Sequence, residues 1–229
     1  MKTILIVGNS DGIGLAVTRA LVARGERVVG ISRSPSPLGA SDLRHEVRDV
    51  TAPDFGGLVE QLSREHGGFD ACIYCAGVGS ALALPDVSSE SRVFEVNLTG
   101  MVRTMQALVP EWLAKRRGHF VGLSSIADDI YNSDAPSYSA SKAGFSNYLI
   151  SVGIKLRPLG IAVTNVRFGF VDTKMAKSPQ KPMMMTAEAA ATHILRCLET
   201  RPLQLTAPKV MGFLVHLLHW AQSVRIWMT

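Results

Sequence analysis

Tyr138 and Lys142, four residues apart, are the two side chains whose types and spacing point most directly to chemistry. On a helix they share a face, so a phenol and an ammonium can act on one group. A phenol with an ordinary pKa of about 10 is a poor acid–base catalyst at neutral pH, and a nearby lysine charge lowers that pKa. Ser125, before a loop, can hydrogen-bond a substrate oxygen. The three groups can polarise a carbonyl and protonate it. A Tyr-x-x-x-Lys pair alone is more often an inert surface pair.

A glycine-rich segment, Gly8-Asn9-Ser10-Asp11-Gly12-Ile13-Gly14, joins an apolar strand to a helix. Glycine permits the tight turn and close backbone approach, and the helix N-terminus offers free N–H groups and a positive dipole end to a pyrophosphate. Its place in a strand–helix–strand unit indicates a dinucleotide site. The same segment contains Gly8-x-Ser10-x-Gly12, the pattern of a hydrolase nucleophile elbow. That alternative needs several preceding strands, and only seven residues precede Gly8.

The type of dinucleotide is indicated by the end of the second predicted strand, Ile31-Ser32-Arg33. A carboxylate about 20 residues after the turn selects NAD, whereas an arginine accommodates the phosphate of NADP. Here a hydroxyl and a guanidinium replace the carboxylate, which favours NADP(H) over NAD(H). Asp11 opposes this by adding a negative charge to the phosphate turn, although it can serve as the helix N-cap.

Strand-like and helix-like segments alternate along the whole chain. The predicted strands are 4–7, 27–32, 43–50, 69–75, 118–124, 161–167 and a short 203–206. The predicted helices are 12–25, 55–66, long helical territory over 88–117, 137–156, 186–199 and a last helix opened by Pro208. This alternation predicts a single α/β domain over residues 1–229, a three-layer doubly wound parallel sheet of the Rossmann type with about seven strands. Ligands of such sheets bind at the carboxyl ends of the strands.

At this point the chain resembles the short-chain dehydrogenase/reductase family, in its compact single-domain branch. The resemblance covers about residues 3–200. It is carried by Gly8-x-x-x-Gly12-x-Gly14, Cys75-Ala76-Gly77, Asn97, Ser125, Tyr138-Ser139-Ala140-Ser141-Lys142 and Gly169-Phe170-Val171-Asp172-Thr173. The combination is highly specific, although each motif alone is not.

The resemblance implies a role for each of these positions. Tyr138 would be the general acid in reduction and the base in oxidation. Lys142 would tune Tyr138 and bind the nicotinamide ribose, Ser125 would orient the carbonyl, and Asn97 would hold a water in a proton relay. The cofactor contacts would be Gly8, Ser10, Asp11, Gly12, Ile13, Gly14, Ser32, Arg33, Asp49 and Val50 (adenine), Cys75, Ala76, Gly77, Tyr138, Lys142, Gly169, and Val171 and Thr173 (carboxamide). The hydride chemistry belongs to the cofactor.

Three positions depart from the pattern of the family. Tyr74-Cys75 replaces two asparagines, Phe168 replaces the proline before Gly169, and Val7 replaces a threonine before the first glycine. None of them touches the proton-transfer group, but the loss of proline predicts a less stiff loop after the sixth strand.

Composition excludes several classes of protein. A hydrophobic fraction of 47% and a charged fraction of 19% exclude a disordered chain, and the net charge of 24 − 19 = +5 is too scattered for a nucleic-acid binder. Three cysteines make no disulfide framework, and Cys72 and Cys75 should point to opposite faces of a strand, so we predict no metal site. The N-terminus lacks a signal-peptide core and no apolar stretch is long enough to span a membrane, so we expect a cytoplasmic protein.

Two further segments bear on substrate and partners. Residues 174–187 should form a substrate loop, whose Met175, Met183, Met184 and Met185 favour an apolar carbonyl or alcohol, although they can equally pack under a loop. Asp128, Asp129 and Asp134 can recruit a cation near the predicted site, although such residues more often serve loop turns.

The apolar C-terminal segment, residues 208–228, should be a helix that seeks another surface. We predict first a subunit interface of a homodimer or homotetramer, and second attachment to a membrane surface.

The sequence therefore predicts an NADP(H)-preferring oxidoreductase that interconverts a carbonyl and an alcohol. The alternative is a catalytically silent protein of the same fold that binds the cofactor as a sensor or scaffold.

Overall fold

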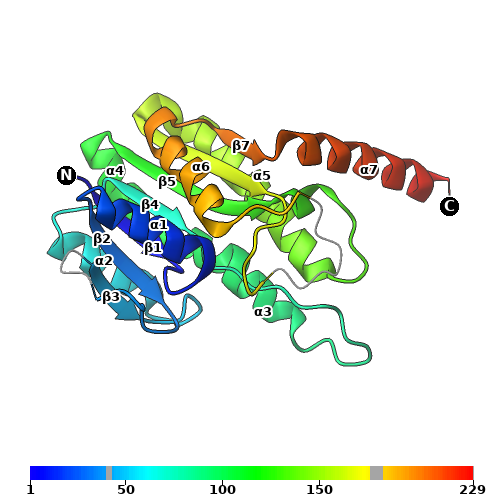
Figure 1. The fold of residues 1–229 in the computed structure, drawn as a ribbon, viewed down its shortest axis with the longest axis horizontal. Helices are drawn as coiled ribbons and strands as arrows, with labels where there is room; N and C mark the ends of the chain where they lie inside the picture. Colours follow the sequence, from blue (N-terminus) through cyan, green and yellow to red (C-terminus); the bar gives the residue numbers. More distant parts are fainter. Residues whose placement is uncertain (40–42, 176–182, 229) are drawn as a thin grey trace.

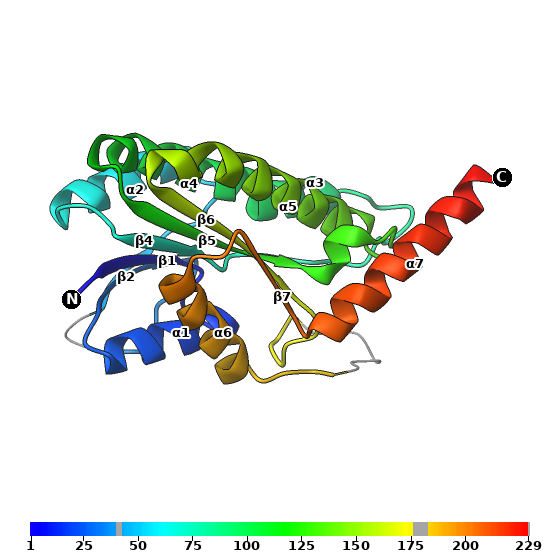
Figure 2. The same cartoon turned by 90° about the horizontal axis from the view of Figure 1, so that it is seen from above.

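A parallel sheet organises the chain, as Figures 1 and 2 show. The computed structural model describes residues 1–39, 43–175 and 183–228. Within these ranges seven strands pair in the order β3-β2-β1-β4-β5-β6-β7, all parallel. They are β1 (Thr3–Val7), β2 (Arg27–Ser32), β3 (Leu43–Val47), β4 (Ala71–Tyr74), β5 (Gly118–Ser125), β6 (Ile161–Phe168) and β7 (Gln204–Ala207). The predicted doubly wound α/β fold is confirmed.

Helices cover both faces of the sheet (Figure 2). One face carries α1 (Gly12–Ala23) and α6 (Ala187–Thr200), and the other carries α2 (Phe55–Glu65), α4 (Gly100–Lys115) and α5 (Pro136–Leu156). The short α3 (Glu90–Phe94) continues through a π-helical turn, η1 (Glu95–Thr99), into α4. Two 3₁₀ turns, η2 (Ile126–Asp129) and η3 (Arg157–Leu159), follow β5 and α5.

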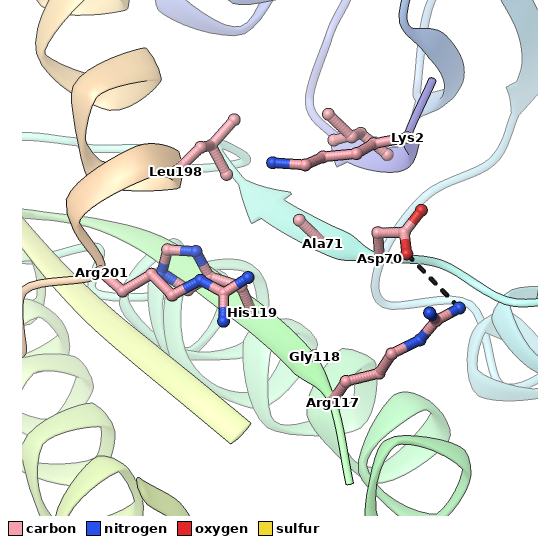
Figure 3. Close-up of a pocket in the computed structure, with 9 residues that line it drawn as sticks. Lys2, Asp70, Ala71, Arg117, Gly118, His119, Leu198 and Arg201 are labelled. Carbon is pink, nitrogen blue, oxygen red and sulfur yellow. Dashed lines mark ion pairs between the residues drawn. The ribbon is translucent and has the colours of Figure 1, made fainter. Parts of the chain in front are cut away.

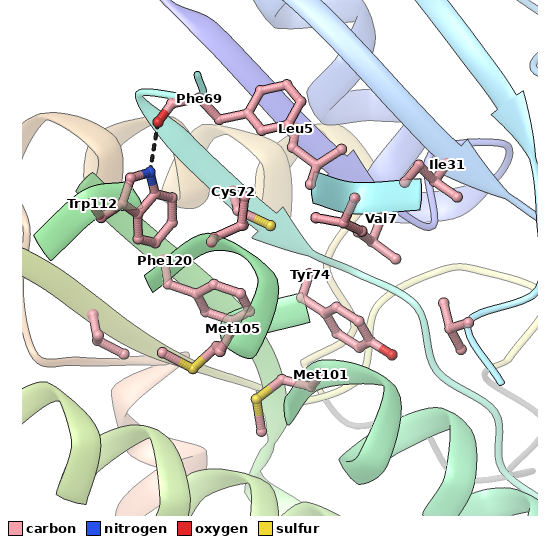
Figure 4. Packing of buried hydrophobic residues seen from close by; sticks show 14 of the residues in the cluster. Leu5, Val7, Ile31, Phe69, Cys72, Tyr74, Met101, Met105, Trp112 and Phe120 are labelled. Carbon is pink, nitrogen blue, oxygen red and sulfur yellow. Dashed lines mark hydrogen bonds between the residues drawn. The ribbon is translucent and has the colours of Figure 1, made fainter. Parts of the chain in front are cut away.

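The alternation of side chains along the strands divides the core into two clusters, one under each helical layer. On β1, Leu5 and Val7 belong to one cluster and Ile4 and Ile6 to the other. Figure 4 shows the first cluster, in which the Trp112 indole Nε1–H donates to the Phe69 carbonyl at 2.7 Å. Cys72 is buried in this cluster and Cys75 packs against the other, so the prediction of opposite faces is confirmed.

Several element boundaries differ from the predicted ones. β3 ends at Val47 rather than Val50, because the carboxylate of Asp49 accepts hydrogen bonds from the backbone N–H and hydroxyl of Thr51, each at 2.9 Å, and so closes a turn. The helical territory predicted over 88–117 is divided into α3, η1 and α4. The last of these ends at Lys115, where Arg116 adopts a left-handed conformation.

The last helix, α7 (Lys209–Trp227), projects away from the sheet (Figures 1 and 2). Its Met211 and Val215 are buried against Ile126 and Ile130, around the turn η2. The Gln222 amide accepts from the Tyr131 N–H at 3.0 Å and donates to the Tyr131 carbonyl at 2.9 Å. None of the helices in the described ranges is long and apolar enough to cross a membrane.

Candidate active site

The predicted site residues gather where the chain leaves two neighbouring strands in opposite directions. β1 and β4 are paired, but the chain proceeds from β1 to β2 on one side and from β4 to β5 on the other. At such a switch point the connecting segments part and leave a crevice at the carboxyl ends of the strands.

The glycine turn after β1 is held by close backbone contacts. Gly8 has a φ of +90°, and a Cβ there would lie 2.6 Å from the backbone nitrogen of Ala76. A Cβ on Gly14 would lie 2.0 Å from the carbonyl oxygen of Gly8, so only glycine lets α1 begin so close to the strand. Gly12 has a φ of +52°, and a Cβ there would lie 3.1 Å from the methyl group of Thr173.

Asp11 is the N-cap of α1, and its carboxylate accepts from the N–H of Gly12 at 2.8 Å. The same carboxylate lies 2.7 Å from the ammonium of Lys174, a residue that the sequence analysis gave no role. The bond from Lys174, followed by that from Gly12, holds the pKa of Asp11 below its ordinary value. Because Lys174 balances the charge of Asp11, the phosphate turn is less negative than the sequence suggests.

This turn fits a dinucleotide pyrophosphate. The first backbone N–H groups of α1 have no carbonyl of a preceding helical turn to bind. Because Gly12 and Gly14 carry no side chain, no Cβ of these residues covers the start of the helix. Ser10 and Ile13 complete the turn, with Ile13 packed partly against the core beneath.

Ser32 and Arg33 lie at the carboxyl end of β2, beside the glycine turn, whose Gly8 N–H donates to the Ile31 carbonyl at 2.7 Å. The Ser32 hydroxyl donates to the Ser34 carbonyl at 2.8 Å and lies 3.3 Å from Nε2 of His45. Arg33 is exposed and forms no ion pair with the described residues. The guanidinium of Arg33 is therefore exposed at the carboxyl end of β2, with no acidic partner among the described residues.

Asp49 and Val50 are not at the end of the third strand, where the resemblance places its adenine contacts. Val50 is buried in the core. The Asp49 carboxylate is already bound by Thr51 and by Arg92. Burial tends to raise the pKa of Asp49, but these bonds together hold it below its ordinary value. The prediction that Asp49 and Val50 end the third strand is wrong, because the strand ends at Val47 and the chain turns at Asp49, while their role as adenine contacts stays a prediction.

The loop after β4 is tied to the helices by Asn97, which lies in the π-helical turn η1 and is fully buried. Its amide accepts from the Val78 N–H at 2.8 Å and donates to the Val78 carbonyl at 2.9 Å and to the Ser141 hydroxyl at 3.0 Å. A Cβ on Gly77 would lie 3.5 Å from the Asn97 oxygen and 3.8 Å from Nζ of Lys142. Asn97, Gly77 and Lys142 are thus adjacent.

Tyr74 supports the same region. Its hydroxyl, in place of the family's asparagine, donates to the Val96 carbonyl at 2.6 Å and joins β4 to η1. Cys75, the next residue, donates its N–H to the carbonyl of Val7 at 2.8 Å.

Ser125, Tyr138 and Lys142 meet at the end of β5. The Ser125 hydroxyl accepts from the Ala127 N–H at 3.1 Å and donates to the Phe168 carbonyl at 3.5 Å, and it lies close enough to the Tyr138 phenol to affect its pKa. The Lys142 ammonium donates to the Leu123 carbonyl at 2.7 Å and lies 5.9 Å from the centroid of the Tyr138 ring. All three predicted proton-transfer residues therefore lie side by side.

The electrostatics of this group differ from the expectation. Enclosure by the protein raises the pKa of Tyr138, the hydroxyl of Ser125 opposes the rise, and the charge of Asp128 adds to it. Burial lowers the pKa of Lys142 to about 8. The expected lowering of the tyrosine pKa by the lysine is not found, because the ammonium is itself desolvated and directed at a backbone carbonyl.

The segment after β6 completes the crevice. Gly169 donates its N–H to the Ala207 carbonyl at 3.0 Å, and the side chain of Val171 is buried while its backbone forms a bridge with Met185. Thr173 faces Gly12, as described above, and the methyl group of Met175 would lie 3.6 Å from a Cβ on Gly77. Residues 176–182 of the predicted substrate loop lie outside the described residues.

A separate cavity of about 170 Å³ lies at the amino ends of the strands, opposite the crevice (Figure 3). It is lined by Lys2, Arg117, His119 and Arg201, among others, and by none of the predicted site residues. Arg117 and Arg201 follow the C-termini of α4 and α6, where cations balance the helix dipoles. This cavity is not a candidate active site. Among the described residues no cluster of three or more His, Cys, Asp or Glu could hold a metal ion.

Comparisons with known proteins agree with this geometry. A family model described as short chain dehydrogenase matches residues 2–183. An uncharacterized oxidoreductase of Myxococcus xanthus is 32% identical over 201 residues, which cover 82% of this chain and 79% of that protein. A 3-oxoacyl-(acyl-carrier-protein) reductase of Vibrio cholerae is 29% identical over 188 residues, covering 77% of this chain and 76% of the relative.

The fold also matches solved structures. A short chain dehydrogenase from Burkholderia cenocepacia, crystallised in complex with NADP, superposes with a TM-score of 0.80 at 22% identity. The match covers 90% of this chain and 87% of that one.

The close contact at Gly14 makes a testable prediction about stability. Gly14→Ala places a methyl group against the Gly8 carbonyl and should lower the free energy of unfolding by roughly 1–3 kcal/mol. Gly56→Ala is the matched control, because its Cβ in helix α2 meets nothing within 4 Å. It should stabilise the protein by about 0.5–1 kcal/mol. Urea unfolding of both variants measures the difference, and equal effects would contradict the proposed contact.

Proposed function

We propose that this chain, which belongs to the short-chain dehydrogenase family, interconverts a carbonyl and an alcohol with a nicotinamide dinucleotide and uses Tyr138 as general acid and base. Its relatives are named oxidoreductases, and we assign it the same class of activity. The observation that carries the proposal is the meeting of Ser125, Tyr138 and Lys142 beside the glycine turn.

The bound cofactor supplies a hydride, and the residues of this chain orient the substrate and transfer the proton. The hydroxyls of Ser125 and Tyr138, which lie close together, can both hydrogen-bond one substrate oxygen. As that oxygen gains negative charge in reduction, Tyr138 gives it a proton, while Ser125 stabilises it by a hydrogen bond. In oxidation the phenolate takes the proton back.

Lys142 and Asn97 act on this pair and on the cofactor. The Lys142 ammonium lies beside the phenol, 5.9 Å from the centroid of its ring. It also lies within reach of Gly77, where a nicotinamide ribose would be bound. Asn97 fixes the loop that carries Gly77 through its two bonds to Val78. We propose that the backbone of η1 at Asn97 holds the water that returns a proton to the site.

Tyr138→Phe removes only the transferable proton. It should lower kcat for ketone reduction by about 10²–10⁴-fold while cofactor affinity stays within a few-fold. Tyr148→Phe, on the same helix α5, is the matched control and should keep its activity. A panel of aliphatic, aromatic and small polar ketones and aldehydes serves as substrate, with oxidation of NADPH followed by absorbance.

Two outcomes would argue against this assignment. Unchanged kcat in Tyr138→Phe would remove Tyr138 from the mechanism. Tight cofactor binding by the native protein with no turnover on the whole panel would favour the alternative, a silent sensor or scaffold.

We propose that NADP(H) is preferred over NAD(H). Arg33 is exposed and forms no ion pair with a described residue, and the end of β2 carries no carboxylate; both features support a site for a phosphate. The exposed ion pair of Asp11 with Lys174 offsets part of the negative charge that opposes NADP(H) binding. The relative solved with NADP has the same fold.

Arg33→Gln tests the preference. The variant should raise the dissociation constant of NADPH by roughly tenfold or more, because a charge-assisted hydrogen bond is lost, and should leave that of NADH nearly unchanged. Arg19→Gln, an exposed arginine of α1 on the far side of the turn, is the control. Nicotinamide fluorescence measures both affinities, and an equal effect on the two cofactors would refute the role of Arg33.

The substrate is proposed to be apolar. Met175, whose methyl group lies near Gly77, Met183 and Met184 are exposed, and methionine adapts to irregular apolar shapes. The relative named as a 3-oxoacyl-(acyl-carrier-protein) reductase acts on a carbonyl in an acyl chain, which is consistent with such a lining. A clear preference of the native protein for small charged ketones would contradict this proposal.

We further propose that α7 joins copies of the chain into a homodimer or homotetramer. Phe213, Leu217, Trp220 and Val224 form one outward strip on α7 and are exposed. We take residues 1–229 as one domain, with this helix as its assembly surface. The three free cysteines suit a reducing compartment, and we place the protein in the cytoplasm.

Replacing Phe213, Leu217 and Trp220 by serine should lower the particle mass measured by light scattering to that of a smaller assembly. Val47→Ser and Leu84→Ser, which change exposed apolar residues elsewhere, should leave the mass unchanged. An unchanged mass together with loss of binding to liposomes would instead assign the strip to a membrane surface.

A further inference from the structure

A buried ion pair lies directly behind the proposed proton-transfer group. The Arg167 guanidinium donates to both carboxylate oxygens of Asp128 at 2.6–2.9 Å. The side chains are only 13% and 4% exposed. Burying two charges is costly, and a pair of hydrophobic residues often serves stability as well. The pair is therefore a candidate for a role in the reaction.

The pair is the centre of a clamp on three elements. Asp128 belongs to η2, Arg167 to β6, and Ser146 on α5 donates its hydroxyl to the same carboxylate. Ser146 also lies 2.7 Å from the hydroxyl of Ser124 and accepts from the Asn165 amide at 3.0 Å. One carboxylate thus holds η2 against the strands and helix of the site.

The clamp reaches the proposed catalytic residues from two sides. Ser125 is the N-cap of η2, so the position of its hydroxyl depends on the turn that Asp128 anchors. On α5, Ser146 follows Lys142 by four residues and Tyr138 by eight, so the three share one face of the helix.

Asp128 is also the charge that opposes the burial of Lys142. The titratable groups that act on this ammonium are Asp128 from η2 and Cys75 after β4, and Tyr138 lies beside it on its own helix. Burial raises the pKa of Cys75 to about 12, and that of Tyr138 is also raised, so both are neutral at neutral pH. Asp128 is the acidic group of this set that carries the negative charge: burial raises its pKa, and the hydrogen bonds from Arg167 and Ser146 oppose that rise.

We propose that Asp128, clamped by Arg167, is a positioning residue of the site: it fixes the turn that carries Ser125 and, through Ser146, the face of α5 that carries Tyr138 and Lys142. Its effect on turnover rests on the proposed function, whereas its effect on the charge of Lys142 is measured without turnover. A charged Lys142 is the form that can hold a ribose hydroxyl.

Asp128→Asn tests the charge directly. The ¹³Cε NMR signal of Lys142, assigned with Lys142→Arg, reports its titration without any need for turnover. In the native protein it should titrate near pH 8, and in the variant its midpoint should move to lower pH, because the ammonium loses its partner charge. The alkaline limb of the pH profile of kcat/KM should also move to lower pH, so that kcat/KM of the variant at pH 8 falls by roughly threefold or more.

Three further variants separate charge from structure. Asp129→Asn removes a neighbouring carboxylate that contacts Arg167 at 3.6 Å and His216 at 3.0 Å but does not act on Lys142. The NMR midpoint of Lys142 and the alkaline limb of kcat/KM should therefore both stay in place. Asp128→Glu keeps the negative charge and should also leave both quantities unchanged. Asp128→Asn combined with Arg167→Gln leaves no orphaned buried charge, so it should fold even where the single variant does not, and it should still show the shift.

Two results overturn the inference: an unmoved Lys142 midpoint in Asp128→Asn and in the double variant, or a loss of activity that is equal at every pH. A native protein that shows the NMR shift on substitution but no turnover on any carbonyl would instead refute the proposed function and leave the electrostatic role of Asp128 standing.

Discussion

The parting of the chain at β1 and β4 is the constraint on which the site depends. Two adjacent parallel strands deliver their following segments to opposite sides, and the crevice between those segments must be lined by backbone that comes very close. Gly8 against Ala76 and Gly14 against the carbonyl of Gly8 show how close it comes. With side chains at these glycines the helix α1 would stand further from the sheet, and its free N–H groups would no longer face the space beside Lys142.

The crevice also encloses the ammonium of Lys142 and shields it from water. Lys142 is buried beside a phenol, and its burial works against its own charge. Backbone oxygen from Leu123 and the carboxylate of Asp128 work in the other direction. The same carboxylate raises the pKa of Tyr138, so one anion favours a protonated acid and a protonated lysine together.

The architecture and the gathering of the site were predictable from local pattern. Alternating apolar segments predict the sheet, and strand ends in a parallel sheet meet at one edge, which places Gly8, Gly77 and Ser125 together. The ion pairs that the sequence analysis did not predict join residues that lie far apart in the chain. Arg167 is 39 residues from Asp128, and Lys174, which follows β6, pairs with Asp11, which follows β1. The π-helical turn at Asn97 and the end of β3 at Val47, before the turn at Asp49, arise from hydrogen bonds that residue type alone does not specify.

The strand order has a consequence for how the protein is made. β1, β2 and β3 come from the first 47 residues, so all three strands are synthesised before β4. The other wall of the crevice comes from β4, η1 and α5, which are synthesised later. The edge of β1 that pairs with β4 therefore stays unpaired until β4 arrives, and the glycine turn is made before the segments that carry Ser125, Tyr138 and Lys142.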